Sequence, residues 1–547
     1  MQLEEKTRLE TQIASIFPDE SSIPEEFQLK EPIHQHEFLI DGELRAWDGE
    51  TQEAYSAIYV RKDGKLEPKL IGTFPLMTEK EALLAMVAAC NAYDRGKGHW
   101  CTAEVAERIE RVQDFAYRMK EKRQEVVKLL MWEIGKSLAD SEKEFDRTIA
   151  YIEDTIDALK NLDRNHSRFV IEQGIIGQIR RAPLGVVLCL GPTNYPLNET
   201  FTTLIPALIM GNTVVLKAPR PGVMLYRPLL EAFRDAFPPG VVNTVYGNGR
   251  TVSPPIMSSG RVDALAFIGS SRAASSLKKM HPKPHRLRSI LGLEAKNAAI
   301  ILPDADLALT VKECVLGTLS YNGQRCTALK ILFVHRQVVE LFLRQFCEAI
   351  AALKFGMPWE KGVTITPLPE IDKPNYFTEL VEDAKQYGAQ VVNESGGTVN
   401  HSFFYPAVVY PASPEMRVYR EEQFGPVIPV VPFDDIEQPI RYIEDSDYGQ
   451  QASIFGQDAD AIARLVDPLV NQVSRLNINS QCQRGPDTFP FTGRKDSAEG
   501  TLSVVDALRA FSIRTLVAAK ENEMNKAILT KVVREHKSNF LSTNFIL

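Results

Sequence analysis

Five short apolar runs, separated by segments with helical spacing, constrain the fold of this chain more than any other feature. They occupy residues 185–190, 213–216, 241–245, 264–268 and 298–302. The runs are short and mainly apolar, which is typical of parallel strands that are covered by helices on both faces of a sheet. The sequence therefore predicts an α/β fold with a parallel sheet, and such sheets bind ligands at the carboxyl ends of their strands.

Turn-forming and polar residues come directly after four of these runs. The four segments are 191–196 (GPTNYP), 217–220 (KAPR), 247–249 (GNG) and 269–271 (GSS). Glycine allows a close approach of the backbone to a ligand, and a helix N-terminus favours phosphate. One such segment would be an ordinary turn or helix cap. Four of them in register on one sheet predict a dinucleotide pocket.

A cysteine in a polar turn is the second informative feature. Cys326 lies in the segment 321–327 (YNGQRCT), directly after Arg325. A neighbouring positive charge lowers the pKa of a thiol, and the thiolate is the form that attacks carbon. A lone cysteine is more often a small buried apolar residue. The flanking Asn-Gly-Gln-Arg does not suit a packing position, so we predict that Cys326 is a nucleophile.

Helical patterns come before the first apolar run. Thr78 with Glu81 and Ser141 with Glu144 have the spacing of capping boxes, so residues 78–162 are predicted to be mostly helical. The polar segment 1–36, with its acidic clusters and prolines, is expected to pack on the body or to stay mobile. The remaining expectations are a hairpin within 169–181, a second α/β section over 303–506, a strand near 510–517 and a polar, helix-prone tail.

Composition excludes several classes of protein. The 547 residues allow two or more domains, and 44% hydrophobic with 24% charged residues is an ordinary globular balance. A net charge of -8 gives no general attraction to nucleic acid or to anionic membranes. The seven scattered cysteines, without a CxxC pair, favour a reducing compartment, and nine scattered histidines imply no metal site. The N-terminus lacks an apolar targeting region and no run of about 18 apolar residues occurs, so we expect a cytoplasmic protein.

Four motifs in one order resemble the aldehyde dehydrogenase superfamily. They are GPTNYP (191–196), GQRCT (323–327), EEQFGPV (421–427) and PFTGRK (490–495). The resemblance covers residues 38–518. It is greatest to the NADP-dependent non-phosphorylating glyceraldehyde-3-phosphate dehydrogenases, because of NYP, GQRC, QRGPD (483–487) and RTI (147–149).

The resemblance implies a Rossmann-like dinucleotide-binding domain, an α/β catalytic domain and a bridging β element. The expected segments are an N-terminal extension (1–36), an NADP-binding domain (37–292) interrupted by bridging strands (167–182), a catalytic domain (293–507), a bridging strand (508–518) and a C-terminal tail (519–547). In this family the bridging element pairs between subunits, which covers its strand edges. The resemblance therefore implies a homodimer or homotetramer.

The same resemblance assigns roles to individual residues. Cys326 would attack the aldehyde carbon, and the Asn194 side chain with the Cys326 N–H would hold the oxyanion. Hydride would pass to the nicotinamide and water would release the acid from a thioester. The residues that would bind the cofactor are Lys217 at the ribose, Ser270 at the pyrophosphate, Gly247 and Gly269 in the pocket wall, and Glu422 and Phe424 at the nicotinamide end.

Arginines indicate the form of the cofactor and the substrate. Arg220 stands where NAD-preferring relatives often carry a glutamate, and a guanidinium can bind a 2′-phosphate. We expect NADP, with NAD as the alternative and a surface arginine as the other reading. Arg325, Arg484 and Arg147, together with Tyr195, match residues that hold the substrate phosphate of glyceraldehyde 3-phosphate. The alternative is that these arginines form structural ion pairs with neighbours such as Asp487.

The chain departs from the family at the general base. Where the family has Glu-Leu-Gly-Gly-Lys, this sequence has Gly292 at the place of the glutamate and Glu294 two residues later. In an extended chain two residues return a side chain to the same face, about 6.6 Å further along, so Glu294 is our candidate for the base. The departure leaves two alternatives open. One is an enzyme that passes the acyl group to coenzyme A, and the other is a non-catalytic scaffold protein.

Overall fold

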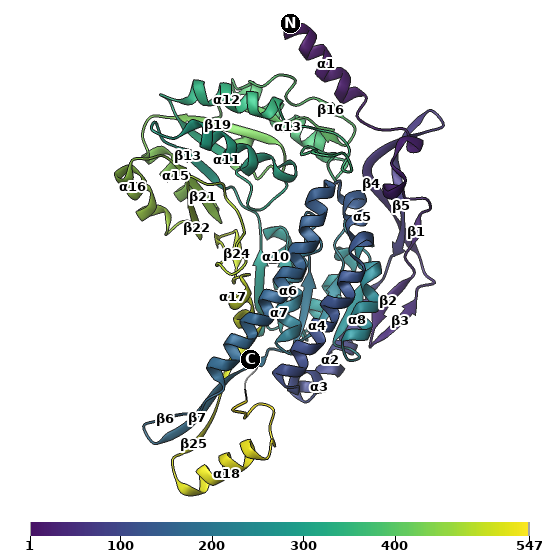
Figure 1. Ribbon diagram of the computed structural model, residues 1–547, viewed down its shortest axis with the longest axis vertical. Helices are drawn as coiled ribbons and strands as arrows, with labels where there is room; N and C mark the ends of the chain where they lie inside the picture. Colours follow the sequence, from purple (N-terminus) through teal and green to yellow (C-terminus); the bar gives the residue numbers. More distant parts are fainter. Residues whose placement is uncertain (1, 545–547) are drawn as a thin grey trace.

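The computed structural model describes residues 2–544, which contain two large, mainly parallel sheets (Figure 1). The first sheet has the strand order β10-β9-β8-β11-β12-β24. Its strands are β8 (Val186–Leu190), β9 (Thr213–Lys217), β10 (Val242–Val245), β11 (Ala264–Ile268), β12 (Arg288–Gly292) and β24 (Ala498–Glu499). All its pairs are parallel except β12 with β24.

The order of the first sheet reverses between β8 and β11. From β8 the chain continues through β9 to β10 on one side, whereas β11 and β12 lie on the other side. Ligands of open α/β sheets bind at such a switch point, beyond the carboxyl ends of the strands. The segments 191–196 and 269–271 follow these two strands, so the sheet brings together residues that are 73 or more positions apart.

The second sheet has the order β15-β18-β19-β14-β13-β21-β22. Its strands are β13 (Ala298–Ile301), β14 (Ile331–His335), β15 (Gln390–Val391), β18 (Ala407–Tyr410), β19 (Val427–Phe433), β21 (Gln451–Phe455) and β22 (Arg475–Ile478). The fifth apolar run of the sequence is β13, and it begins this second sheet. This run lies within the segment 293–507 that the resemblance assigns to the catalytic domain.

Helices cover both sheets. The first section has α2 (Glu79–Tyr93), α4 (Val105–Glu121), α5 (Arg123–Ile134), α6 (Leu138–His166), α7 (Asn198–Ile209), α8 (Leu230–Ala236), α9 (Gly249–Ser258) and α10 (Ser271–Met280). The second has α11 (Leu307–Leu319), α12 (Val339–Ala351), α13 (Lys373–Gln386), α15 (Glu437–Asp445), α16 (Ala459–Leu469) and α17 (Val504–Ala510). Among residues 2–544, no helix is long and apolar enough to span a membrane.

One of the two predicted capping boxes is confirmed. Thr78 and Glu81 form a complete capping box at the start of α2. The second prediction was wrong, because α6 begins three residues before Ser141 and is capped by Ser137, whose side chain accepts from Asp140 N–H. Ser141 and Glu144 lie inside the helix and are buried. Glu144 is therefore available for contacts outside its own helix.

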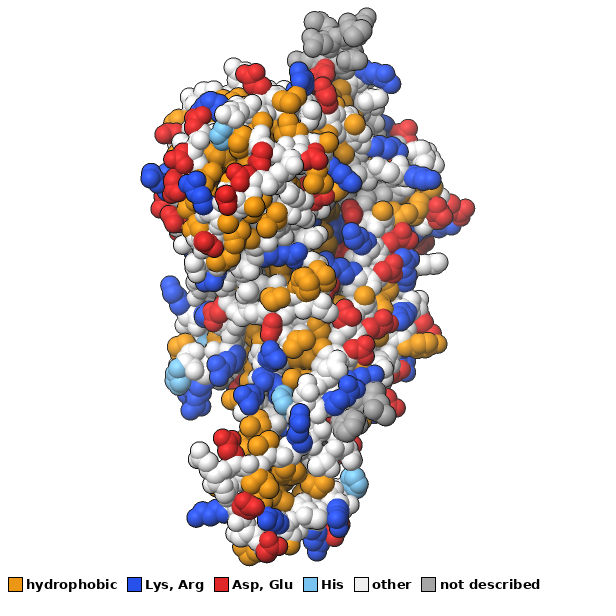
Figure 2. All heavy atoms as spheres, turned by 60° about the vertical axis from the view of Figure 1, so that its left-hand side comes forward, with side chains coloured by type: hydrophobic (Ala, Val, Ile, Leu, Met, Phe, Trp, Pro, Cys, Tyr) orange, Lys and Arg blue, Asp and Glu red, His pale blue; other side chains and the backbone are white. Residues whose placement is uncertain are grey.

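A three-stranded sheet projects from the body beside the C-terminal helix (Figure 1). It has the order β25-β7-β6, with β6 (Val170–Glu172), β7 (Ile175–Pro183) and β25 (Ser512–Lys520) all antiparallel, and α18 (Glu523–Arg534) follows. The predicted hairpin and the late strand are thus confirmed. Apolar side chains gather on this projecting part in Figure 2, and those of Leu516 and Met524 are 57% and 67% exposed.

The N-terminal extension packs on the body. Ile13, near the end of α1 (Gln2–Ala14), and Phe17, after this helix, are both buried. The Asn400 side chain donates to the carbonyl of Ile13 at 2.7 Å. The strands that follow are β1 (Ile33–His34), β2 (Glu37–Ile40), β3 (Glu43–Ala46), β4 (Thr51–Lys62) and β5 (Lys65–Pro75). Of the two alternatives for this segment, the structure shows the packed one.

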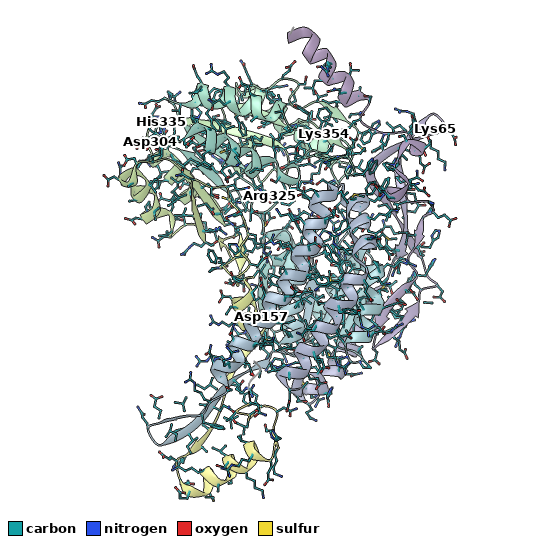
Figure 3. All side chains as sticks on the ribbon, viewed as in Figure 1. Lys65, Asp157, Asp304, Arg325, His335 and Lys354 are labelled. Carbon is teal, nitrogen blue, oxygen red and sulfur yellow. The ribbon has the colours of Figure 1, made fainter. Side chains whose placement is uncertain are left out.

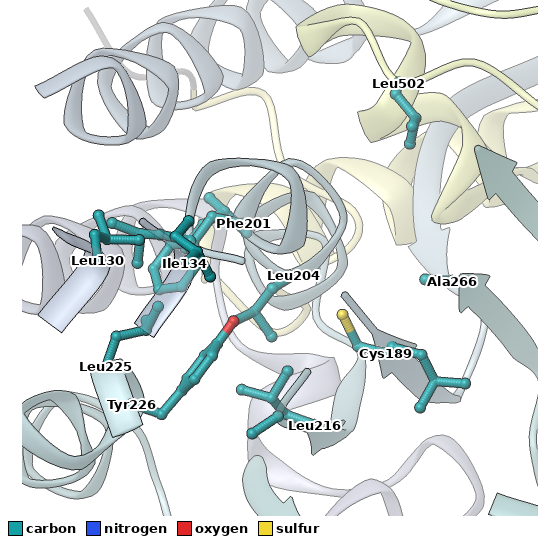
Figure 4. Close-up of a cluster of buried hydrophobic side chains, with 14 of the residues drawn as sticks. Leu130, Ile134, Cys189, Phe201, Leu204, Leu216, Leu225, Tyr226, Ala266 and Leu502 are labelled. Atoms are coloured by element: carbon teal, nitrogen blue, oxygen red, sulfur yellow. The ribbon is translucent and has the colours of Figure 1, made fainter. Parts of the chain in front are cut away.

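The α7 helix forms the centre of the core. Figure 4 shows Leu204 and Phe201 of α7 between Leu216 and Ala266 of the first sheet and Leu130 of α5. Burial of a large aliphatic or aromatic side chain contributes about 1.5–3 kcal/mol. The helix that follows the GPTNYP loop is therefore fixed on all sides, and it fixes the loop in turn.

Candidate active site

The loop that carries Cys326 has a constrained backbone. Tyr321, Asn322 and Gly323 have consecutive positive φ angles of 48°, 55° and 73°. A Cβ on Gly323 would lie 2.6 Å from the carbonyl oxygen of Thr318, so only glycine fits there. The Asn322 side chain holds the loop, because its amide donates to the Thr366 carbonyl and accepts from the Thr366 N–H, both at 3.0 Å. Strained backbone of this kind gathers at functional sites.

The Cys326 backbone is held from two directions. Its carbonyl accepts from Asn297 Nδ2 at 2.8 Å and from Lys330 Nζ at 3.1 Å. The side chain is half-buried. Burial raises the pKa of its thiol, and the Glu199 carboxylate raises it further, while Lys330 and Arg484 lower it. The expectation that a neighbouring cation lowers this pKa was thus wrong in its net direction, because burial dominates.

Asn194 meets the cysteine loop, as the sequence predicted. Its Nδ2 donates to the carbonyl of Gln324 at 2.8 Å, two residues before Cys326. An amide nitrogen carries two hydrogens. The contact with Gln324 uses one of them and leaves the second for a ligand oxygen.

A buried lysine that sequence reasoning missed supports Asn194. Lys136 Nζ is fully buried, donates to the Asn194 carbonyl at 2.9 Å and forms an ion pair with Glu144. It lies 3.5 Å from the centre of the Tyr195 ring and 4.4 Å from that of Tyr321. Burial lowers the pKa of Lys136, and the Glu144 carboxylate opposes this shift, while the two aromatic rings offer their faces to the ammonium. No local sequence pattern indicates this lysine.

The three predicted arginines have different surroundings. Arg147 binds Asp487 through two hydrogen bonds of 2.7 and 3.0 Å, and Arg484 donates to the same carboxylate at 3.3 Å. Arg484 is buried and also pairs with Glu199. Burial alone would lower the pKa of Arg484, but Glu199 and Asp487 outweigh it and raise that pKa. The ion-pair alternative considered from the sequence is therefore seen at Asp487.

Arg325 is bound to neutral oxygens. Its guanidinium donates to the carbonyls of Leu316 and Gly317, at the end of α11, at 3.1 and 3.2 Å, and to Gln481 Oε1 at 3.2 Å. Its buried Nε makes no hydrogen bond to residues 2–544. Figure 3 shows Arg325 where the second α/β section meets the helices of the first. Among residues 2–544, the three arginines have two carboxylate partners between them, so one guanidinium of this set is not paired with a carboxylate.

The first sheet presents the predicted dinucleotide residues at its carboxyl edge. The half-buried Lys217 ends β9, and its ammonium makes no hydrogen bond to the part of the chain that the structure describes. Burial, helped by Arg220, lowers the pKa of Lys217 to about 8. Arg220 is exposed and donates to Gln52 Oε1 at 2.8 Å. A half-buried cation without a protein partner suits ribose and phosphate oxygens, so these residues fit a dinucleotide.

Glycines shape the same edge. Gly247 has a φ of +102°, and a Cβ there would lie 2.9 Å from the backbone nitrogen of Met77. A Cβ on Gly269 would lie 2.5 Å from the ring of Phe267. Ser270 caps α10, its side chain accepting from the Ala273 N–H at 3.3 Å. These positions therefore require glycine and a capping residue for the fold itself.

Glu294 and Glu422 lie between the two sections. Glu294 accepts from the Ser271 N–H at 2.7 Å, which places its carboxylate at the N-terminus of α10. Glu422 accepts from Lys330 Nζ at 2.5 Å and from the Ala295 N–H at 3.0 Å. Lys330 also lies 5.5 Å from the ring centre of Phe424, which has a φ of 50°. Glu422 and Phe424 are thus joined to the Cys326 loop through one lysine.

The family model for the aldehyde dehydrogenase family matches residues 61–517. The chain belongs to the aldehyde dehydrogenase family. It is similar to the NADP-dependent glyceraldehyde-3-phosphate dehydrogenase of Pisum sativum, with 29% identity over 88% of this chain and 96% of the relative. The enzyme of the same name from Streptococcus equinus is 32% identical over 81% of this chain and 91% of the relative.

A solved aldehyde dehydrogenase structure gives the same picture. The NADP-dependent glyceraldehyde-3-phosphate dehydrogenase of Bacillus halodurans, complexed with NADP, matches with a TM-score of 0.80 and 29% identity. The match covers 89% of this chain and 99% of the other. The aldehyde dehydrogenase fold predicted from the motifs is confirmed, and the chain is an NAD(P)-dependent enzyme that acts on an aldehyde group.

Glu199 is the other group of this aldehyde dehydrogenase that sequence reasoning missed. It lies in the first turn of α7, five residues after Asn194, and its carboxylate is buried beside Arg484. The signal was present in the sequence, because 198–200 (NET) interrupts an otherwise apolar helix. A charged residue in a helix surrounded by core has to be paired, and pairing of this kind indicates a site.

Proposed function

We propose that this enzyme oxidises glyceraldehyde 3-phosphate to 3-phosphoglycerate with NADP, through a thiohemiacetal and a thioester on Cys326. The observation that carries the proposal is the contact between Asn194 and the cysteine loop. The amide of Asn194 lies 2.8 Å from the Gln324 carbonyl, and its second hydrogen is available to an oxyanion on the carbon that Cys326 attacks.

The residues of the chain act in sequence. Sγ of Cys326 bonds to the aldehyde carbon, and the Asn194 side chain with the Cys326 N–H stabilises the oxygen that gains charge. Lys217 and Arg220 would hold NADP, which would supply the acceptor for the hydride that leaves this carbon. Water would then replace the sulfur on the acyl carbon and release the acid. Glu422 and Phe424, which both contact Lys330, would lie at the nicotinamide end.

The arginines support a phosphorylated substrate. Arg325 has neutral partners only, and the set of Arg147, Arg325 and Arg484 exceeds its carboxylate partners in charge. Tyr195, on the same loop as Asn194, packs on Lys136 and would form the wall beside the substrate. The relatives named above carry the same activity in their names, which supports this choice of substrate.

The substrate test compares glyceraldehyde 3-phosphate with glyceraldehyde in the wild type and in Arg325→Gln. One charge-assisted hydrogen bond is worth about 1.5–3 kcal/mol, so we expect kcat/KM for the phosphate ester to fall about 10- to 150-fold in the variant. The value for glyceraldehyde should change less than about twofold. Equal kcat/KM values for both aldehydes in the wild type would refute the phosphate assignment. Cys326→Ala should abolish NADPH formation, and retained activity would contradict the whole scheme.

A preference for NADP over NAD follows from the cations near the end of β9. Arg220 and Lys217 are close enough for each to act on the other, and no carboxylate at position 220 repels a 2′-phosphate. In Arg220→Glu, we expect kcat/KM for NADP to fall at least about tenfold while that for NAD is kept or rises. An unchanged ratio of the two values would show that Arg220 is only a surface residue.

Transfer of the acyl group to coenzyme A is the second candidate function. It is favoured by Gly292, which leaves the family's position for the catalytic carboxylate empty. An assay without phosphate or coenzyme A decides between the two. Sustained NADPH formation supports hydrolysis, whereas one turnover followed by a stall that coenzyme A relieves supports acyl transfer.

We further propose that the enzyme is a cytoplasmic homodimer or homotetramer that assembles through the β25 strand. β25 is an edge strand of its sheet, and it exposes Ile513 and Leu516. Such an edge needs a partner to avoid uncontrolled pairing. Light scattering during size-exclusion chromatography should give two or four times the mass of 61.3 kDa, and a monomer would contradict this proposal.

A further inference from the structure

The position at which the family carries its base is open in this chain. Gly292, at the end of β12, is not in a left-handed conformation, and a Cβ there would meet only Ile268 at 3.5 Å and Leu502 at 3.7 Å. These are ordinary contact distances, so a Cβ at this position is not excluded by packing.

Another carboxylate is buried one helical turn beyond the loop that carries Asn194. Glu199 is only 7% exposed, although glutamate is almost never buried without a partner. Its N–H donates to the carbonyl of Tyr195 at 3.2 Å, so it lies one helical turn beyond the loop whose Asn194 contacts the cysteine segment. The Glu199 charge is also the largest charge effect on the Cys326 thiol. Helix α7 thus carries a buried carboxylate near the loop that contacts the cysteine segment, on an element other than β12.

Of the two carboxylate oxygens of Glu199, one is bound by a partner and the other accepts no hydrogen bond from residues 2–544. Oε2 pairs with Arg484, which is itself fixed by Asp487 at 3.3 Å and by the Leu502 carbonyl at 3.3 Å. Oε1 accepts no hydrogen bond from residues 2–544. Leu502 also borders Gly292, so the arginine anchors Glu199 close to the empty position. A fixed carboxylate with one unused oxygen has the form of a general base.

Glu294 has a different environment. Its carboxylate accepts from the Ser271 N–H at the start of α10, which is the place predicted for the cofactor pyrophosphate. A negative charge at a helix N-terminus is stabilised by the helix dipole. Glu294 is therefore bound within the cofactor edge of the first sheet, whereas Glu199 is bound to the arginine of the substrate site.

We propose that Glu199 is the general base of deacylation in this enzyme, in place of the glutamate that Gly292 lacks. The inference rests on the proposed aldehyde oxidation. The oxygen of water bonds to the acyl carbon of the thioester, and one water proton passes to Oε1 of Glu199. The bond between that carbon and Sγ breaks, its electron pair stays on Cys326, and the carboxylic acid leaves. The proton on Glu199 then passes to the Cys326 thiolate or to solvent.

The test separates acylation from deacylation in Glu199→Gln. Rapid mixing with NADP and glyceraldehyde 3-phosphate should give an NADPH burst of one equivalent per active site, at a rate within about threefold of the wild type. The steady-state rate after the burst should fall about 100-fold or more, within the usual range for loss of a general base. Intact-mass spectrometry of the quenched variant should show the acyl group on Cys326, and hydroxylamine added to this isolated species should release it.

Asp487→Asn is the matched control, because it removes the other carboxylate that holds Arg484. It should raise KM for the substrate without accumulation of the acyl enzyme. If Glu199→Gln turns over like the wild type after its burst, or if both variants accumulate acyl enzyme equally, Glu199 is not the base. If the wild type forms no NADPH with either glyceraldehyde 3-phosphate or glyceraldehyde, the proposed function fails instead, which is a distinguishable result. Circular dichroism of each variant confirms that it is folded, and Glu199→Asp should recover part of the steady-state rate.

Discussion

Replacing Lys136 with methionine should destabilise this enzyme and slow its chemistry together. The ammonium is fully buried, pairs with Glu144 and donates to the Asn194 carbonyl at 2.9 Å. Methionine fills a similar volume but leaves Glu144 buried without its counter-charge. Glu144 keeps only the N–H groups of Leu197 and Asn198, both at 3.1 Å.

Removal of one partner from a buried ion pair costs about 3–5 kcal/mol. At about 2 °C per kcal/mol, the lower end of the scale for large domains, the thermal midpoint should fall by roughly 6–10 °C. In Lys136→Met/Glu144→Gln the uncompensated charge is gone, so we expect the midpoint to recover by about 4 °C relative to the single variant. Differential scanning fluorimetry at one protein concentration measures both values.

The same change reaches the active site through Asn194. Loss of one hydrogen bond to its carbonyl, worth about 1–1.5 kcal/mol, should slow the NADPH burst roughly tenfold. A control at Glu340, an exposed glutamate of α12, should alter neither quantity when changed to glutamine. If Lys136→Met lowers the midpoint by less than about 2 °C, or if the two substitutions add, the buried pair does not hold this part of the fold.

Three further predictions follow from single groups. Burial and Arg220 lower the pKa of Lys217 to about 8, so the ammonium is lost as pH rises through 8. The Kd for NADP, measured by fluorescence titration, should therefore rise above pH 8 in the wild type but not in Lys217→Met. A flat profile from pH 7 to 9 in the wild type would contradict this. Gly323→Ala should lower the free energy of unfolding by about 1–3 kcal/mol and reduce the NADPH burst, since the new Cβ would lie 2.6 Å from the Thr318 carbonyl oxygen at a φ of +73°. An unchanged midpoint of urea unfolding would refute this prediction. Leu516→Lys, on the exposed edge of β25, should lower the oligomer mass in light scattering with no change in secondary structure, and an unaltered mass would place the interface elsewhere.

Local patterns predicted much of the fold. The short apolar runs became strands, and Thr78 with Glu81 became a complete capping box. The spacing at Ser141 and Glu144 looked the same but lies inside α6, because a buried Glu144 binds Lys136 and the start of α7 instead of capping its own helix. A capping box is a local signal, and a tertiary partner can use the same side chain differently.

The candidate site was predicted where its residues follow strands or interrupt a pattern. Cys326, Asn194 and Lys217 lie where the motifs indicated, at the carboxyl edges or in the polar turn. The partners of the arginines could not be read in the same way. Arg484 and Glu199 are 285 positions apart, and Arg147 and Asp487 are 340 apart. The sequence around one partner therefore does not indicate the other.

The sequence by itself determined the family and most strands, and it supplied Cys326 as the candidate nucleophile, because each depends on residues within one short segment. Only the tertiary structure decided which charges compensate one another: Lys136 with Glu144, and Arg484 with Glu199 and Asp487. Buried charges must be paired at short distance whatever their separation along the chain. The packing of α7 in the core therefore decided that the carboxylate of Glu199 is buried beside Arg484, 285 positions away along the chain.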